Sequence, residues 1–295
     1  MKKWKDWKPK TAVGQVLVQL TRRYYLHGVA RDSAALTYYL LFAVFPLLIL
    51  VSSLLGILEL DVEEITRFLL RFVPLDVVNT VEAYLNYVSE NSSRQLLWFS
   101  LVFSLWFPMR ATASLLYSMR KAFGRPQPTN VLFAWLRTLF FTGWLLLSLT
   151  LSLTAITVGR RLLTFAGRFV VLPDWLTELW EPLRFVLLGV VMWILISLLY
   201  RLAMERKGRW REIAPGVAMS LCAWMFLSLA FSYYVERFAH YTELYGSIAA
   251  IVVALLWIYM GANVLILGAE LSGVLLERRE AREQRNGAVK KEENQ

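Results

Sequence analysis

Cysteine and histidine are scarce in this sequence. Its 295 residues include one cysteine, Cys222, and two histidines, His27 and His240. A single cysteine forms no intrachain disulfide and no zinc cluster. The sequence also has no phosphate-binding Gly-rich loop, no His-Glu-x-x-His motif and no group of residues typical of a catalytic triad. We therefore expect no catalytic residues, no metal site and no cofactor, and a protein that is not an enzyme.

Charged residues are few as well. They make up 18% of the chain, whereas soluble domains usually contain about a quarter. Hydrophobic residues reach 57% and the mean hydropathy is +0.48. Such a composition excludes an ordinary soluble domain and favours an integral membrane protein.

Six apolar segments are each long enough to cross a hydrocarbon layer of about 30 Å as a helix. They cover residues 34–58, 96–117, 132–158, 183–203, 213–235 and 246–276. None shows the alternation of polar and apolar residues that is typical of a barrel strand. The sequence therefore predicts an all-α integral membrane protein, with a bundle of six transmembrane helices over residues 34–276.

Basic residues alternate between the two sides of these segments. The lead before residue 34 contains eight Lys and Arg, and the second loop, the fourth loop and the tail are also basic. The first loop is acidic, and the fifth loop has only Arg237. Basic loops mark the cytoplasmic side, so we expect a multi-pass protein of the cytoplasmic membrane with both termini inside the cell. The net charge of +10 is then explained without nucleic acid, which we do not expect as a partner.

Three segments outside the spans have their own character. Residues 1–33 form a cytoplasmic lead in which Val13, Val16, Leu17, Leu20 and Tyr24 follow helical spacing, which indicates an amphipathic interfacial helix. The first loop has two apolar patches separated by Pro74, which predict two short extracytoplasmic helices. These helices either cap the bundle or lie free at the outer surface. The charged tail, 277–295, is expected to continue the last helix briefly and then to be disordered.

Arg110 is the clearest candidate for a functional residue. It follows Pro108 within an otherwise apolar segment, and a charge inside a membrane is costly unless it is paired or hydrated. From the end of the predicted span it lies roughly 10 Å inside the apolar layer. Two interpretations stay open: the side chain extends to the cytoplasmic surface, or it binds an anionic group in a polar cavity.

Two carboxylates are expected on the same side of the membrane as Arg110. Glu270 lies near the end of the last segment, and Asp32 lies just before the first. Either could pair with Arg110, in a transport site or in an ion pair that only holds the bundle together. Asp32 has a second interpretation as the N-cap of the first helix. Pro46, in the middle of the first span, predicts a kink that serves either as a hinge or as a packing shape.

Small and polar residues in the last segment indicate close helix contacts. Ala250 and Ala254 are four residues apart, as are Ala269 and Gly273. Such spacing lets helices approach closely, within one chain or in a homo-oligomer. Asn263 is a candidate for a hydrogen bond between helices.

Several short runs together resemble the membrane family called YihY, virulence factor BrkB or ribonuclease BN-like. The runs are the segment from Asp32 to Tyr39, which includes Thr37 and Tyr38; Pro46 with Leu47; Pro215 with Gly216; Tyr245 with Gly246; Trp257 with Tyr259; and Gly268 with Glu270. The resemblance covers about residues 20–277 and implies a bacterial cytoplasmic-membrane protein with six spans.

The resemblance and the residues lead to two functional hypotheses. The first is a transporter or flippase-like protein for an amphipathic or anionic envelope component, with membrane lipids around it and a lipid or anionic solute as its ligand. The alternative is a membrane scaffold or assembly factor that transports nothing. The ribonuclease label fits this sequence poorly, because metal-dependent nucleases need clustered carboxylates or histidines that face water.

Overall fold

We describe the protein from a computed structural model. It describes residues 11–58, 78–79, 82–83, 87, 94–127, 130, 132–144, 174–204, 210–245 and 247–293. These residues form helices joined by short connections, and no strand occurs among them. The helical fold class expected from the sequence is therefore confirmed for this part of the chain.

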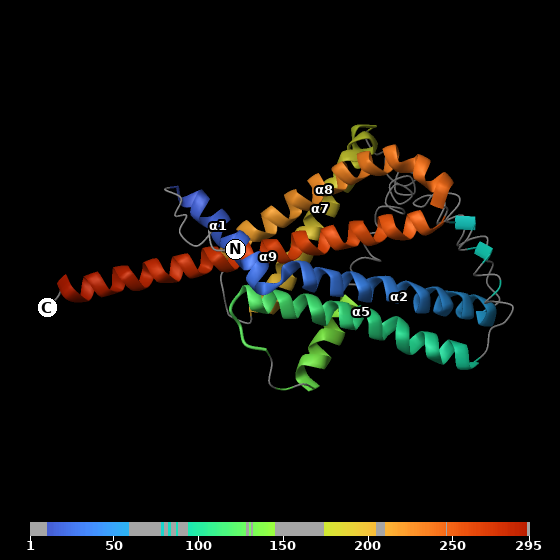
Figure 1. The fold of residues 1–295 in the computed structure, drawn as a ribbon, viewed down its shortest axis with the longest axis horizontal. Coiled ribbons are helices and arrows are strands. Elements are labelled where there is room, and N and C mark those ends of the chain that lie inside the picture. The colour runs from blue at the N-terminus through green and yellow to red at the C-terminus, as the bar shows by residue number, and fades with distance from the viewer. Residues whose placement is uncertain are drawn as a thin grey trace. The chain divides into compact units, whose positions relative to one another are not determined.

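The main helices are α1 (Ala12–His27), α2 (Val29–Leu58), α5 (Arg94–Ala122), α7 (Asp174–Met204), α8 (Trp210–Tyr245) and α9 (Ser247–Glu293). α1 lies in the predicted amphipathic lead, and the other main helices follow predicted apolar segments (Figure 1). Residues 132–144 are helical too, and the rest of the third predicted span lies outside the described residues. Within the described residues, four helices are long and apolar enough to cross a membrane, and Leu188–Met204 is a shorter apolar helix. The count of six spans and the orientation of the termini stay predictions.

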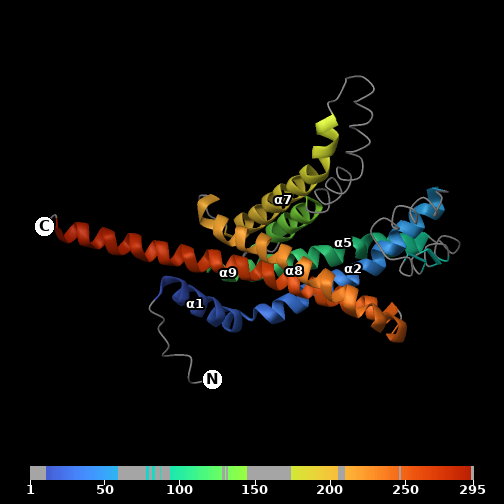
Figure 2. The ribbon, with the colours of Figure 1, turned by 90° about the horizontal axis from the view of Figure 1, so that it is seen from above.

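The chain forms two compact units. The first, unit 1, contains Met1–Arg31, Leu115–Phe226 and Asn263–Gln295; the second, unit 2, contains Asp32–Ser114 and Leu227–Ala262. In unit 1, α1 lies beside α9, and α7 lies beside helix 132–144 (Figure 2). In unit 2, α2 and α5 lie side by side (Figure 1).

Local sequence explains where α1 begins and ends. The hydroxyl of Thr11 accepts a hydrogen bond of 3.2 Å from the backbone N–H of Gly14 and so caps the N-terminus. Gly28 ends the helix with φ 67°, a left-handed conformation that is strained for residues other than glycine. Since α2 starts directly at Val29, Asp32 lies in the first turn of α2. Its interpretation as an N-cap was wrong, because the helix begins three residues earlier.

The interior between the helices contains small and hydroxyl-bearing residues, whereas many bulky apolar side chains face outwards. Buried polar residues include Ser100, Ser104, Thr112, Thr138, Thr142, Ser197, Ser220 and Ser272. Trp98, Phe140, Phe226 and Leu229 are among the exposed large apolar residues. Small and hydroxyl side chains at helix contacts are typical of membrane bundles, and such extensive exposed apolar surface is rare on soluble monomers. The distribution supports a membrane setting.

The packing of α8 against α9 in unit 1 depends on glycine. A Cβ atom placed on Gly216 would collide with the carbonyl oxygen of Gly268 and with Oγ of Ser272. A Cβ on Gly268 would collide in turn with the side chains of Ser220 and Tyr200. Ser272 Oγ donates to the carbonyl of Ile213 over 3.1 Å. The two helices therefore approach closely enough for their backbones to touch.

Two further predictions concern the charged tail and the first loop. α9 continues to Glu293, where the sequence favoured only a short continuation and then disorder. Residues of high helix propensity fill this segment, and Arg279 pairs with Glu283 one turn later at 2.9 Å. The two helices expected around Pro74 lie almost wholly outside the described residues.

Candidate functional site

Glu270 is the centre of a charged cluster in unit 1. Its carboxylate is fully buried, with 0% of the side chain exposed. Oε2 accepts from Nη1 of Arg23 at 3.3 Å, and Oε1 lies 2.5 Å from Nδ1 of His27. Arg23 and His27 are four residues apart on α1 and therefore share one face of that helix. The buried carboxylate is thus held by two basic side chains from α1.

Arg23 links this carboxylate to two further groups. Its Nη1 donates to the carbonyl of Ala122 at the end of α5 over 3.0 Å, and its Nη2 lies 2.5 Å from Oε1 of Glu277. Arg23 thus lies between the carboxylates of Glu270 and Glu277, and His27 also faces Glu270. The cluster joins α1, α9 and the end of α5, which is the role of a bundle-holding ion pair.

A second bond joins α1 to α9 near the cluster. The hydroxyl of Tyr24 donates to Oδ1 of Asn263 over 3.3 Å. This contact confirms the prediction that Asn263 forms a hydrogen bond between helices.

Tyr200 ties α7 to both α8 and α9. Its hydroxyl lies 2.7 Å from Oγ of Ser220 and donates to the carbonyl of Leu265 over 2.6 Å. The ring is completely buried. Sequence reasoning missed Tyr200, Arg23 and His27, because each acts through a partner that is distant in the chain.

Arg110 lies on α5 in unit 2 and is exposed. Its Nη2 donates to the hydroxyl of Tyr39 over 3.4 Å, and its Cζ lies 5.5 Å from the centre of the Tyr39 ring. In the part of the chain that the structure describes, no carboxylate lies within ion-pair distance of Arg110. The structure thus does not pair Arg110 with Asp32, and the described partners of Glu270 are Arg23 and His27.

A row of aromatic rings leads away from Arg110 along α2 and α5. The ring centres of Tyr38 and Phe42 are 4.4 Å apart, and those of Phe42 and Phe107 are 5.9 Å apart. The row continues over 5.9 Å to Phe103 and over 4.5 Å to Phe99. Both of its ends are exposed. Among its described residues, unit 2 thus presents aromatic rings next to a cation that no described carboxylate neutralises.

The other residues singled out in the sequence include both buried and exposed positions. Asp32 and Thr37 are buried, and the Thr37 hydroxyl donates to the carbonyl of Ser33 over 2.8 Å. Pro46 and Pro108 lie inside α2 and α5, and their role as hinges stays a prediction. Pro215 lies near the start of α8, and Trp257 and Tyr259 lie on α9. Tyr245 ends α8, while Gly246 lies outside the described residues.

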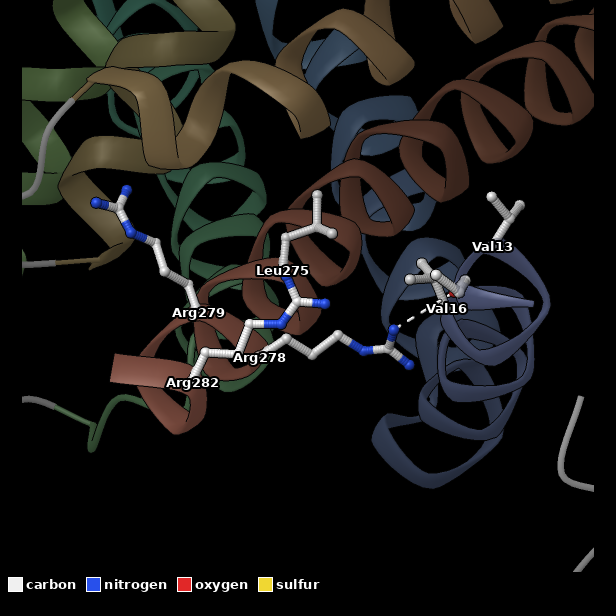
Figure 3. A pocket seen from close by; sticks show the side chains of 7 residues that line it. Val13, Val16, Leu275, Arg278, Arg279 and Arg282 are labelled. Atoms are coloured by element: carbon white, nitrogen blue, oxygen red, sulfur yellow. Dashed lines mark hydrogen bonds between the residues drawn. The ribbon is translucent and has the colours of Figure 1, made fainter. Parts of the chain in front are cut away.

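A surface pocket separates the start of α1 from the end of the apolar part of α9 (Figure 3). It has a volume of about 300 Å³ and is lined by Ala12, Val13, Val16, Leu275, Arg278, Arg279 and Arg282. Arg278 extends across to α1 (Figure 3), where it donates to Oε1 of Gln19 over 2.9 Å and to the carbonyl of Ala12 over 3.4 Å. Elsewhere, no group of three or more His, Cys, Asp or Glu side chains suited to a metal ion occurs within the described ranges.

The chain is similar to one protein of nearly its own length and to several longer ones. The chain is 28% identical over 263 residues to the ribonuclease-like protein YfkH of Bacillus subtilis, and the match covers 89% of this chain and 96% of that protein. UPF0761 membrane proteins of Stenotrophomonas maltophilia and Xanthomonas campestris are 27% and 28% identical over 86% of this chain. The chain spans only 59% of the length of these UPF0761 proteins. No solved structure matches the chain.

The family comparison covers nearly all of the described helices. The model of virulence factor BrkB matches residues 20–293, from within α1 to the end of α9. Together with the apolar helices and the membrane-protein relatives, this match shows that the chain is a membrane protein of the virulence factor BrkB family.

Proposed function

We propose that this protein is a transporter or flippase-like protein of the cytoplasmic membrane, with both termini in the cytoplasm. Its substrate is an anionic or amphipathic component of the envelope, and Arg110 binds the anionic group. The observation that carries the proposal is the position of Arg110, a cation within an apolar helix whose described contacts are made with a tyrosine.

The depth of Arg110 supports binding over extension to the surface. Arg110 precedes Arg120 and Lys121, the basic residues in the last turn of α5, by ten residues or more, which is about 15 Å of helix. A cation–π contact contributes about 0.5–2 kcal/mol, whereas a charge in the middle of a membrane costs about 3 kcal/mol or more. The contact with Tyr39 alone therefore does not offset the charge, and an anionic ligand would.

The aromatic row supports an amphipathic substrate. Tyr38, Phe42 and Phe107 form the part of the row closest to Arg110 along the two helices. An acyl chain or another apolar group packs favourably on such rings, while its anionic end lies at the guanidinium. The row and the cation belong to the same unit, so one ligand can contact both.

We infer a role other than catalysis, although one relative carries a ribonuclease-like name. Glu270, an acid within a candidate span, is fully buried and bound by Arg23 and His27. Glu270 is therefore not in contact with water, whereas the carboxylates of a metal-dependent nuclease site need such contact.

Reconstitution in liposomes tests the transport proposal. Fluorescent phosphatidylglycerol and phosphatidylcholine are compared for movement between leaflets, with wild-type protein and with Arg110→Met. We expect the variant to move phosphatidylglycerol at least tenfold more slowly. Arg201→Met is the matched control, because Cζ of Arg201 lies 4.8 Å from the ring centre of Trp210 in a similar cation–π contact. Equal rates for wild type and Arg110→Met would remove Arg110 from the mechanism.

The scaffold hypothesis has one observation in its favour. α9 carries exposed charged residues beyond Leu276 and stays helical to Glu293, which is a surface suited to a partner. Deleting residues 287–295 leaves Glu277 and Arg278 in place. Loss of a co-purifying partner without loss of lipid movement would favour the scaffold.

A further inference from the structure

The pocket between α1 and α9 lies where the apolar part of α9 ends. The candidate span in α9 runs through Ile251–Asn286, but its last uncharged residue before a run of charges is Leu276. Leu275 and Arg278 line the pocket from this transition. In a membrane such a transition from apolar to charged residues marks the layer of the lipid headgroups.

α1 provides the apolar side of the pocket and faces the surroundings with apolar residues. Val13 and Leu17 are 70% and 57% exposed, and no residue of α1 is buried. An amphipathic helix with exposed valine and leucine beside a basic segment is typical of a helix that lies in the membrane interface.

The basic side of the pocket has positive charge that the described residues leave unneutralised. Arg279 is paired with Glu283. Arg278 donates only to the neutral oxygens of Gln19 and Ala12. Arg282 has no hydrogen-bond or ion-pair partner among the described residues. Two guanidinium groups therefore remain available to an anion at the edge of an apolar pocket.

We propose that this pocket binds the phosphate headgroup of an anionic membrane phospholipid through Arg278 and Arg282, with the start of its acyl chains against Val13, Val16 and Leu275. Guanidinium groups form charge-assisted, often bidentate hydrogen bonds with phosphate oxygens. The apolar lining favours a lipid over free phosphate, because inorganic phosphate offers no apolar surface to bury. The site belongs to unit 1 and is separate from Arg110 in unit 2, so it does not depend on the proposed transport.

Lipid binding to the purified full-length protein tests the proposal. Native mass spectrometry from detergent measures the binding of dihexanoyl-phosphatidylglycerol and dihexanoyl-phosphatidylcholine. Thermal unfolding compares the stabilisation by dihexanoyl-phosphatidylglycerol with that by inorganic phosphate. We expect phosphatidylglycerol to bind at least tenfold more tightly than phosphatidylcholine. Arg282→Gln should reduce phosphatidylglycerol binding about tenfold or more without changing the thermal stability of the lipid-free protein, since Arg282 has no described partner to lose.

Two further variants make the test specific. Arg285→Gln removes the same charge from an exposed position of α9 outside the pocket and should leave the affinity within about twofold. Arg278→Gln should weaken binding as Arg282→Gln does. Equal binding of the two lipids, or equal loss with Arg282→Gln and Arg285→Gln, would overturn the proposal. So would inorganic phosphate that stabilises the protein as much as the lipid at the same concentration, because the site would then bind free phosphate.

Discussion

The Nδ1 atom of His27 on α1 lies 2.5 Å from the Oε1 atom of Glu270 on α9, although 243 residues separate them in the chain. Glu270 is fully buried, whereas His27 is partly exposed. The carboxylate therefore depends on His27 and Arg23 for all of its described hydrogen bonds. A buried charge with its partners in place is tolerated, but the loss of either side leaves an unpaired group at high cost.

Replacing Glu270 with glutamine should destabilise the protein by about 3 kcal/mol, the lower end of the range for breaking a buried ion pair. The lower end applies because Arg23 retains some contact with water. Thermal unfolding in detergent measures the change. Glu283→Gln is the control, since it removes an exposed pair with Arg279 that is worth about 0.3–0.5 kcal/mol. Similar losses in the two variants would contradict the role given to Glu270.

Substitution of Gly216 by alanine should destabilise the contact between α8 and α9. The added methyl group collides with the Gly268 backbone, and forced overpacking typically costs about 1–3 kcal/mol. Gly189→Ala on α7 is the matched control, because a Cβ atom at that position would have no neighbouring atom within 4 Å. The control should be neutral or stabilising by up to about 1 kcal/mol. A Gly216→Ala protein as stable as Gly189→Ala would show that the helices are farther apart than described.

The hydroxyl groups of Tyr200 and Ser220 should contribute to the stability of the protein as a hydrogen-bonded pair. Tyr200→Phe removes the hydroxyl that contacts Ser220 Oγ and donates to the carbonyl of Leu265. The free energy of unfolding should fall by about 1–3 kcal/mol. Ser220→Ala and the double variant complete a double-mutant cycle in thermal unfolding. We expect a coupling energy of at least about 0.5 kcal/mol, and strictly additive losses would argue against the bond.

Both ends of the chain should be inaccessible from outside intact cells. In a Cys222→Ser background, cysteines placed at Lys3 and Asn286 should react with a membrane-impermeant maleimide only after permeabilisation. A cysteine at Ser92, in the acidic first loop, should react in intact cells because basic loops are retained inside. Labelling of either end in intact cells would reverse the proposed orientation.

The apolar segments were predictable because their signal is local. A run of about twenty apolar residues has few structures available to it other than a membrane helix, and α2, α5, α8 and α9 follow four of the predicted runs. The length of α9 was underestimated because the tail was assessed for disorder from its charge, whereas helix propensity and Arg279–Glu283 pairing favour a helix.

The charged cluster was not predictable in the same way. Glu270 was recognised as a candidate, but a carboxylate in a helix does not indicate which of 32 Lys and Arg residues will face it. Arg23 contributed only to the count of basic residues in the lead, although its four-residue spacing from His27 was a usable signal. Small residues were more informative: Gly273 approaches the Ala122 carbonyl too closely for a Cβ, which confirms the close contact predicted from Ala269 and Gly273.

The unbroken course of α9 fixes the distance at which its last residues are held. From Glu277 to Glu293 the helix extends about 25 Å past the apolar stretch, at 1.5 Å per residue. A residue on this extension therefore keeps a defined position relative to the apolar part of the same helix, which a disordered tail would not give it. Removing four residues from the extension would shift the residues that follow by about 6 Å and rotate them by roughly one turn of the helix.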